Sequence, residues 1–248
     1  MSAIFPSRKD EAYRYADLDA LKPIWDQLAE PKRILIKAGD KHQHVLLANI
    51  EDVQVRRAEI TLEARAELSL FMLNNASQYG RLEVDVTLRE GARFTLNAAN
   101  IGSGTSTLEI VTNVRHAEPS AVSHQTVRSV LGGKATGSYV GKVAVARDAQ
   151  HTDSEQSVKA MLLDRGATAN CKPELEIFAD DVKCAHGASV GELDAAQLFY
   201  AESRGLDPAA ARALLLEGFI AGLWDEVADE AQREGIATAA HAALRAIA

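Results

Sequence analysis

Residues Cys171 to Asp194 read CKPELEIFADDVKCAHGASVGELD, and this stretch divides the chain into two kinds of sequence. Before it the pattern is typical of strands, and after it the pattern is typical of helices. Apolar side chains alternate on one face of a predicted strand, at Leu175, Ile177 and Ala179. After Asp180-Asp181 the alternation resumes at Val182, Cys184, His186 and Ala188. We expect Gly187 and Gly191 to break this second run, and Asp194 to cap the first helix.

Short alternating runs also fill the chain upstream, from about residue 34, with almost no helical period. Small residues mark corners between the runs, at intervals that are often in the twenties. The expected corners are Ala64-Arg65-Ala66, Gly91-Ala92, Gly132-Gly133, Gly166-Ala167 and Gly187-Ala188. A repeat of about 20–30 residues made of strands and tight corners is typical of a stacked β-solenoid. Because the repeat is degenerate, the pattern alone places a solenoid only slightly ahead of a β-sandwich.

Helical patterns lie near both ends of the chain. We predict an N-terminal helix over Asp17–Glu30, ended by Pro31, with one face formed by Leu18, Leu21, Trp25 and Leu28. Three helices follow the strand region: one over Ala195–Arg204, one that begins at Pro208 and carries apolar residues as far as Val227, and one over about Thr238–Ile247. The second of these is apolar on nearly all sides. We expect the end of the solenoid to cover one side and a partner protein to cover the other.

The composition argues against several classes of protein. The 248-residue chain has a net charge of −8, whereas binding to nucleic acid or to anionic membranes requires a basic surface. No apolar run approaches the roughly 20 residues of a membrane span, and the N-terminus lacks the apolar segment of a secretory signal. With two cysteines and no export signal, we expect a cytoplasmic protein without a disulfide.

Three blocks of the sequence resemble the SufD branch of the SufB/SufD family of iron–sulfur cluster assembly scaffolds. The blocks are HQTVRSVLGGKATGSYVGKVAV (His124–Val145), HTDSEQSVKAMLLDRGATANC (His151–Cys171) and KPELEIFADDVKCAHGASVGELDAAQLFYAESRG (Lys172–Gly205). The resemblance implies a right-handed parallel β-helix and so decides between solenoid and sandwich. The chain then divides into a short N-terminal helical segment (1–33), a β-helix core (34–192) and a C-terminal helical subdomain (193–248).

The sequence departs from the family pattern in three places. Lys159, Ala160 and Met161 stand where asparagine is usual, so we expect an asparagine ladder to be missing from that corner. Cys171 stands where a polar residue is common. The segment EAYRYADLDAL (Glu11–Leu21) is similar to the family's segment just before the core. Family members usually carry a larger helical domain ahead of it, which we expect to be dispensable here or supplied elsewhere.

Cys184 and His186 form the main candidate site. Two residues apart on a strand, their side chains are separated by about 7 Å and can face one partner or one metal centre. From the spacing alone, a thiol and an imidazole packed at a solenoid corner are the commoner arrangement. Both groups also bind iron, but a complete iron–sulfur site needs about four ligands, and the chain has no CxxC motif. The resemblance implies that His186 faces a SufB-like partner at a shared transient cluster, and it leaves a ligand role for Cys184 open.

Other polar motifs fit structural roles better. Asp180 and Asp181 point to opposite faces of the chain and are expected to cap a turn. His42 and His44 share a strand face but lack a third ligand nearby. His151 and Asp153 fit a turn better than a catalytic pair. His124 resembles the family's histidine at the entry to the core, and a packed role is an equal alternative for it. The loops Gly102-Ser103-Gly104-Thr105 and Gly132-Gly133-Lys134 lack the spacing of a phosphate-binding P-loop, so no ATPase site is expected.

The leading hypothesis is therefore a non-catalytic scaffold subunit that pairs with a SufB-like paralogue. By resemblance, its C-terminal helices dock a SufC-like ABC-type ATPase through Phe199, Arg204, Leu215, Phe219 and Leu223. A SufB-like identity is disfavoured, because such a chain is expected to carry a cysteine within Gln156–Ala169 and this one has none. Two alternatives remain: a β-helix that binds or cleaves polysaccharide, which the aromatic content of 5% disfavours, and a purely structural homodimer.

Overall fold

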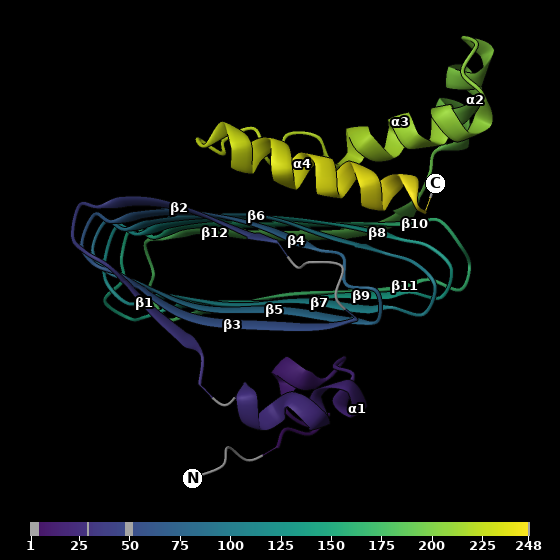
Figure 1. Cartoon of the computed structure of the whole chain (residues 1–248). Helices are drawn as coiled ribbons and strands as arrows, with labels where there is room; N and C mark the ends of the chain where they lie inside the picture. Colours follow the sequence, from purple (N-terminus) through teal and green to yellow (C-terminus); the bar gives the residue numbers. More distant parts are fainter. Residues whose placement is uncertain (1–4, 29, 48–51, 248) are drawn as a thin grey trace.

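The computed structural model describes residues 5–28, 30–47 and 52–247, and its core is a parallel β-solenoid (Figure 1). The strands form two six-stranded sheets, one in the order β1-β3-β5-β7-β9-β11 (sheet A) and the other in the order β12-β10-β8-β6-β4-β2 (sheet B). Because the chain alternates between the sheets, each odd strand and the even strand after it make one rung. The mainly β architecture with helical ends is thus confirmed.

The strands of the first three rungs are β1 (Lys32–Ile36), β2 (Lys41–Leu47), β3 (Val53–Leu62), β4 (Glu67–Asn74), β5 (Tyr79–Leu88) and β6 (Arg93–Gly102). Those of the last three are β7 (Thr107–His116), β8 (Val122–Leu131), β9 (Thr136–Val145), β10 (Asp153–Leu162), β11 (Thr168–Ile177) and β12 (Lys183–Glu192). Val53 pairs with Tyr79, 26 residues later, whereas Thr136 pairs with Thr168, 32 residues later. This uneven rung length explains why the repeat is hard to see in the sequence.

The corners keep the backbone hydrogen-bond ladder continuous between the sheets. At one corner Arg65 N donates to Glu90 O at 2.8 Å, and at the same corner two rungs on Ser120 N donates to Gln150 O at 2.8 Å. Four of the five predicted corners are corners in the structure. The prediction for Gly187-Ala188 is wrong, and so is the expected break at Gly191, because β12 runs through both positions. The ladder with β10 holds these glycines in extended conformation, with Gly187 opposite Ser157.

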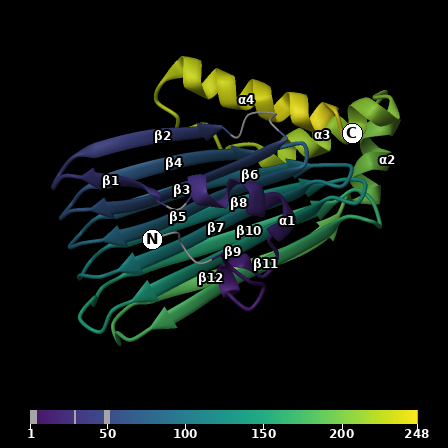
Figure 2. The ribbon, with the colours of Figure 1, turned by 60° about the horizontal axis from the view of Figure 1, so that its bottom comes forward.

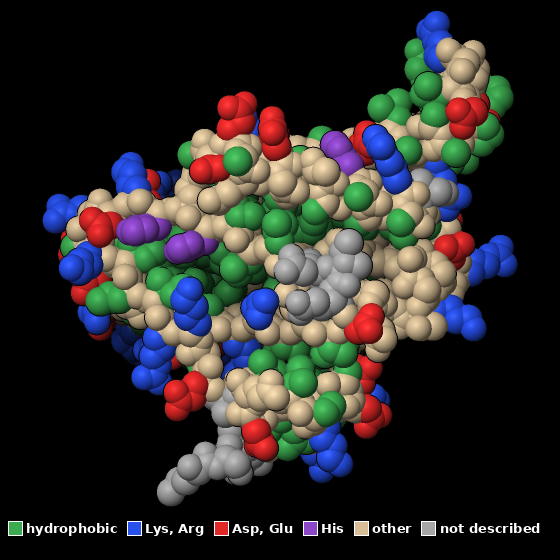
Figure 3. Space-filling view, viewed as in Figure 1, with side chains coloured by type: hydrophobic (Ala, Val, Ile, Leu, Met, Phe, Trp, Pro, Cys, Tyr) green, Lys and Arg blue, Asp and Glu red, His purple; other side chains and the backbone are tan. Residues whose placement is uncertain are grey.

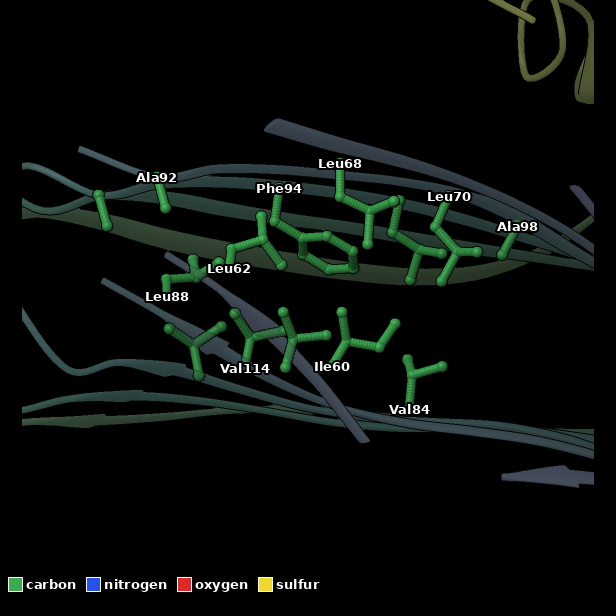
Figure 4. Close-up of a cluster of buried hydrophobic side chains, with 14 of the residues drawn as sticks. Ile60, Leu62, Leu68, Leu70, Val84, Leu88, Ala92, Phe94, Ala98 and Val114 are labelled. Atoms are coloured by element: carbon green, nitrogen blue, oxygen red, sulfur yellow. The ribbon is translucent and has the colours of Figure 1, made fainter. Parts of the chain in front are cut away.

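The core lies in the lumen between the two sheets. Figure 4 shows aliphatic and aromatic side chains of the early rungs pointing toward one another there. The register places aliphatic side chains of successive rungs side by side: Leu70 lies beside Leu96, and Ile60 beside Val86. At the ends of β4 and β6 an asparagine ladder replaces the aliphatic contacts, with Asn74 Nδ2 3.0 Å from Asn100 Oδ1. Ser129 of β8 lies beside Asn100, and Ala160 of β10 lies beside Ser129. The asparagine ladder therefore does not reach β10, as predicted.

The N-terminal segment packs on the outer face of sheet A (Figures 1 and 2). In place of the single helix expected over 17–30 there are three short pieces: η1 (Glu11–Tyr13), α1 (Leu18–Leu21) and η2 (Lys22–Gln27). Pro23 explains the break, because it has no N–H for the next α-helical hydrogen bond. Arg81 holds the segment in place: its guanidinium lies 4.2 Å from the centre of the Tyr13 ring, and it forms a buried ion pair with Glu109 at 3.2 Å.

The C-terminal helices are α2 (Ala195–Ser203), α3 (Pro208–Ile220) and α4 (Glu230–Arg245). In Figure 1, α3 and α4 lie across the outer face of sheet B, and α2 projects beyond it. The expectation that the solenoid end covers these helices is therefore wrong. The outer face of sheet B is itself apolar, with Phe71, Leu73 and Val130 buried against the helices. The second helix is also shorter than expected, because the chain turns at Gly222, whose φ is +84°.

Among the described residues, no helix combines the length and the apolar composition that crossing a bilayer requires.

Gly133 offers a test of the corner geometry. Its φ is +62°, and an added Cβ would lie 2.9 Å from the backbone nitrogen of Gly104 in the neighbouring corner. We expect Gly133→Ala to lower the free energy of unfolding by about 1–3 kcal/mol, measured by chemical denaturation. The control is Gly218→Ala in α3, where nothing lies within 4 Å of the added Cβ; it should raise stability by up to about 1 kcal/mol. Equal effects of the two substitutions would contradict this account.

His116 gives a prediction for pH dependence. Burial in the lumen lowers the pKa of this imidazole to about 4, below the roughly 6.5 of an unfolded chain. The unfolded state therefore binds the proton first as pH falls, and the free energy of unfolding should drop between about pH 6.5 and pH 4, by up to about 1.4 kcal/mol per unit. Chemical denaturation across this range should show a shallower slope in His116→Gln. The exposed His124→Gln is the control and should keep the wild-type slope.

Candidate functional site

The site predicted from the sequence lies at one open end of the solenoid. Strands β11 and β12 are the last members of sheets A and B, so each has one edge without a neighbouring strand among the described residues (Figure 2). Both are ten residues long, whereas the edge strands at the other end, β1 and β2, have five and seven residues. Most of β12 is exposed, including Val190. Long strand edges that lack a neighbouring strand are suited to pairing with another chain.

His186 and Cys184 lie on this edge strand, on the side that continues the lumen. In register, His186 lies beside Gln156 of β10, and Cys184 lies beside Ser154. Gln156 and Ser154 are both buried in the lumen, so the two residues of β12 share a face, as predicted. His186 is exposed and Cys184 is half-buried against the core. The imidazole is therefore accessible from outside the chain, next to a hollow of ≈ 380 Å³ lined by residues of β10 and β12.

Two polar columns lead through the lumen to these two residues. One consists of Ser123 and Ser154, whose hydroxyl oxygens are 2.9 Å apart, and it continues to Cys184. At its inner end His116 Nε2 lies 2.9 Å from Ser123 Oγ. Hydrogen bonds of this kind satisfy polar groups that would otherwise be costly to bury. Burial raises the pKa of the Cys184 thiol, with a smaller contribution from the charge of Asp153, so the chain alone favours the neutral thiol.

The second column consists of Gln125 and Gln156, and it continues to His186. The phenol of Tyr139, from the opposite sheet, lies between the two amides: its oxygen is 3.1 Å from Gln125 Oε1 and 2.9 Å from Gln156 Nε2. Thr112 Oγ1 completes the group, 2.9 Å from Gln125 Oε1. In these two columns of sheet B polar side chains thus replace the Phe94 and Leu96 of the preceding rung, whereas Val127 and Val158 continue an apolar column beside them.

Cys171 lies in the same last rung, a placement that the sequence analysis missed. On β11 it pairs with Tyr139 and is half-buried against the core, so it faces the lumen from sheet A while His186 faces it from sheet B. The sequence alternation could have shown this, since Cys171 is four residues before the apolar Leu175 and so lies on the same face of the strand. Burial raises the pKa of the Cys171 thiol. Among the described residues, however, no three His, Cys, Asp or Glu side chains are grouped closely enough to hold a metal ion.

The remaining candidate residues have structural positions. His42 and His44 stack with ring centres 6.4 Å apart on β2, and they have no third ligand among the described residues. His151 lies in a corner with φ of +60°, where its Nδ1 is 2.9 Å from Asp181 Oδ2 rather than near Asp153. This contact confirms the turn role that was predicted for both His151 and Asp181.

His124 is exposed on the outer face of β8, so a packed role for it is wrong. The two glycine loops lead into β7 and β9, with no helix after either.

Helix α2, the loop after it and the exposed side of α3 carry a second exposed surface. We name the residues Phe199, Tyr200, Leu206 and Leu214 the hairpin patch; all four are exposed, Phe199 by 72% and Leu214 by 53%. Hydrophobic side chains are visible on the projecting part of the molecule in Figure 3. Asp194 and Asp207 begin the two helices by accepting hydrogen bonds from backbone N–H groups of the first turns. Exposed aromatic and aliphatic side chains on a rigid projection are typical of a docking surface.

The five residues predicted to contact an ATPase are distributed unevenly over this surface. Phe199 and Arg204 are exposed, and the Arg204 guanidinium lies 5.0 Å from the centre of the Tyr200 ring. Leu215 and Phe219 are half-buried. Leu223 is only 3% exposed and packs against sheet B, so it has almost no surface to offer a partner. The apolar stripe of α3 is thus used within the chain, and the residues that sequence reasoning missed are Tyr200, Leu206 and Leu214.

Comparison with known proteins gives a family match across most of the chain. Residues 33–219 match the family described as "SUF system FeS cluster assembly, SufBD core domain". The matched region begins near β1 and ends in α3, so it contains the solenoid, the open end and the hairpin patch.

Individual relatives agree with this match. The chain is 31% identical over 183 residues to protein ABCI7, chloroplastic, of Arabidopsis thaliana, covering 72% of this chain and 38% of the relative. It is 32% identical over 159 residues to an iron–sulfur cluster assembly SufBD family protein of Synechocystis, covering 64% and 35%. It is 35% identical over 114 residues to the iron–sulfur cluster assembly protein SufD of Escherichia coli, covering 46% and 27%. The matched stretches therefore span well under half the length of these relatives.

Proposed function

This chain belongs to the SufB/SufD family of the SUF iron–sulfur cluster assembly system, and we propose that within it the chain is a SufD-like scaffold subunit without catalytic activity of its own. The observation that carries the proposal is an exposed imidazole on the free edge of the last rung. His186 is placed there by β12, and it cannot complete a cluster site with the described residues of this chain alone. The remaining ligands must then come from another subunit.

We propose a SufB-like paralogue as the partner at this end. The free edges of β11 and β12 offer ten-residue strands to which a second parallel solenoid can add its own edge strands. Gly187 and Gly191 on β12 leave room for close approach of another backbone, since nothing lies within 4 Å of a Cβ built on either. A transient iron–sulfur cluster, the product that the complex builds, would be held between the two chains by His186, with Cys184 as a further candidate ligand.

Cys184 is suited to that role only after docking. Burial favours its neutral thiol, whereas iron binds the thiolate. Arrival of the metal ion at the joint site would displace the thiol proton, because a bound cation stabilises the thiolate. A thiol that stays protonated until the site is assembled is protected from oxidation in the free subunit.

We further propose that a SufC-like ABC-type ATPase docks on the hairpin patch, in a cytoplasmic or organellar stromal compartment. Phe199 on α2 and Leu214 on α3 are exposed, and neither belongs to a hydrophobic cluster of the described residues. Nucleotide-driven movement of the ATPase would then shift the hairpin relative to the solenoid. This movement would reach the solenoid through the chain segment between β12 and α2 and through the packing of α3 on sheet B.

The role of His186 is tested by cluster formation on the reconstituted complex of this chain with its paralogue and ATPase. We expect His186→Ala to lower the yield of cluster, measured as bound iron and acid-labile sulfide with visible absorption, by roughly tenfold or more. The matched control is His124→Ala, an exposed histidine on the outer face of β8. An unchanged yield with His186→Ala in an intact complex would leave only a structural role for the chain.

The docking surface is tested with Phe199→Asp and Leu214→Asp. Each places a charge where an apolar contact is proposed, and we expect the ATPase to bind at least roughly 30-fold more weakly, measured by isothermal titration calorimetry. Phe178→Asp is the control, because Phe178 is also exposed, by 58%, but lies at the end of sheet A. Phe219 is less suitable for this test, because it is half-buried against the solenoid and a charge there would also destabilise the fold. Wild-type affinity in both hairpin variants would refute docking at this patch.

A further inference from the structure

The side chain of Gln156 is held in one orientation by its neighbours in the lumen. Its Nε2 donates to Tyr139 Oη at 2.9 Å, and Tyr139 Oη in turn donates to Gln125 Oε1 at 3.1 Å. The phenol oxygen therefore lies between the amides of two successive rungs. The Nε2 end of the Gln156 amide is therefore occupied by the phenol, whereas the carbonyl oxygen has no partner among the described residues.

That carbonyl oxygen is unpaired. Gln156 is 1% exposed, and among the described residues no donor lies within hydrogen-bond distance of its Oε1. A buried acceptor without a partner costs about 1–3 kcal/mol, so such atoms are rare in folded proteins and usually have a reason. At the inner end of the same column a second amide atom, Gln125 Nε2, also has no hydrogen-bond partner among the described residues.

The residue in register with Gln156 in the following rung is His186. Neighbouring strands are about 4.8 Å apart, which is within reach of a glutamine side chain and an imidazole that lie on the same face. In the structure the exposed imidazole of His186 does not donate to this oxygen. We propose that Gln156 is the positioning residue of His186: when the His186 side chain turns toward the lumen, one of its ring N–H groups donates a hydrogen bond to Gln156 Oε1. This inference deepens the proposed function and rests on it for its purpose, although the hydrogen bond would form within one chain and can be tested there.

The consequence for chemistry follows from the structure of the neutral imidazole. The ring carries one N–H and one nitrogen with a free lone pair. An acceptor fixed in the lumen selects the tautomer whose N–H points inward, and it leaves the lone pair of the other nitrogen directed out of the open end, where a metal ligand is required. Because Gln156 is itself oriented by Tyr139 of the same rung, the ring would be held by contacts that begin one rung inside the solenoid.

The test is the tautomer of His186 in the free chain, read from two-bond ¹H–¹⁵N correlations of the ring at about pH 8.5, where histidine is neutral. The His186 signals are assigned by their loss in His186→Ala. We expect one dominant tautomer in the wild type and a mixture in Gln156→Leu, which keeps the bulk but removes the acceptor. Gln156→Glu, which keeps an acceptor oxygen, should retain the wild-type tautomer.

The matched control is Gln125→Leu, one rung deeper in the same column and equally in contact with Tyr139. It disturbs the polar group but not the contact with His186, so we expect the wild-type tautomer there. A mixture of the two His186 tautomers in the wild type, or the wild-type tautomer in Gln156→Leu, would overturn the proposal. A mixture in both leucine variants would overturn it as well, because the effect would then belong to the packing of the column.

Cluster yield on the assembled complex separates this inference from the proposed function. We expect Gln156→Leu to lower the yield several-fold and to have no further effect in a His186→Ala background. If His186→Ala leaves the yield unchanged, the proposed function fails. The tautomer measurement still shows whether Gln156 accepts a hydrogen bond from His186. If His186→Ala abolishes the yield but Gln156→Leu matches the wild type in both yield and tautomer, the positioning role fails alone.

Discussion

The structure depends on the backbone hydrogen-bond ladder that runs from rung to rung. Inside the stack every strand has a neighbour on both sides, and the ladder continues through the corners, so few polar backbone groups are left over. A linear stack must nevertheless stop, and at each end a row of donors and acceptors is left unpaired. The two ends of the solenoid differ in how well their edge strands are protected against pairing. β1 and β2 are short and carry Lys32, Arg33, Lys41 and two histidines, all residues that discourage edge pairing. β12 is long and carries mostly small residues, so the end for which we propose a function is the one where pairing is left open.

The lumen changes character toward that end. The early rungs are filled by Leu, Ile, Val and Phe, whose burial is the main source of stability. Later rungs carry Ser, Thr, Gln, Tyr and His in the same columns, and each of these side chains must find a hydrogen bond to avoid a cost. A solenoid built only for stability would continue the aliphatic columns to its end. Here the columns end in a thiol and an imidazole, so the polar interior connects the packed core to the chemistry proposed at the edge.

Sequence reasoning reached some of this and missed the rest for identifiable physical reasons. Strand alternation was sufficient to place Cys184 and His186 on one face, because the period of two holds wherever a ladder forms. Alternation could not show that β12 continues through Gly187 and Gly191, since glycine breaks isolated strands but not one held by a neighbouring strand. The polar columns were also out of reach, because Gln125, Tyr139 and Gln156 meet only through register and across the lumen. Leu223 was assigned to a partner because an apolar helix face does not reveal whether a sheet of the same chain already covers it.

The position of the C-terminal helices determines how the two proposed surfaces can work together. Because α3 and α4 cover the outer face of sheet B, they leave the open end of the solenoid free, and one partner can pair with that end while another binds the hairpin patch. The connection between the surfaces is short: β12 ends at Glu192 and α2 begins at Ala195. A displacement of the hairpin would therefore act directly on the strand that carries His186, with no flexible linker to absorb it. That strand is paired on one side only, so it yields to such a displacement more readily than the inner strands of sheet B.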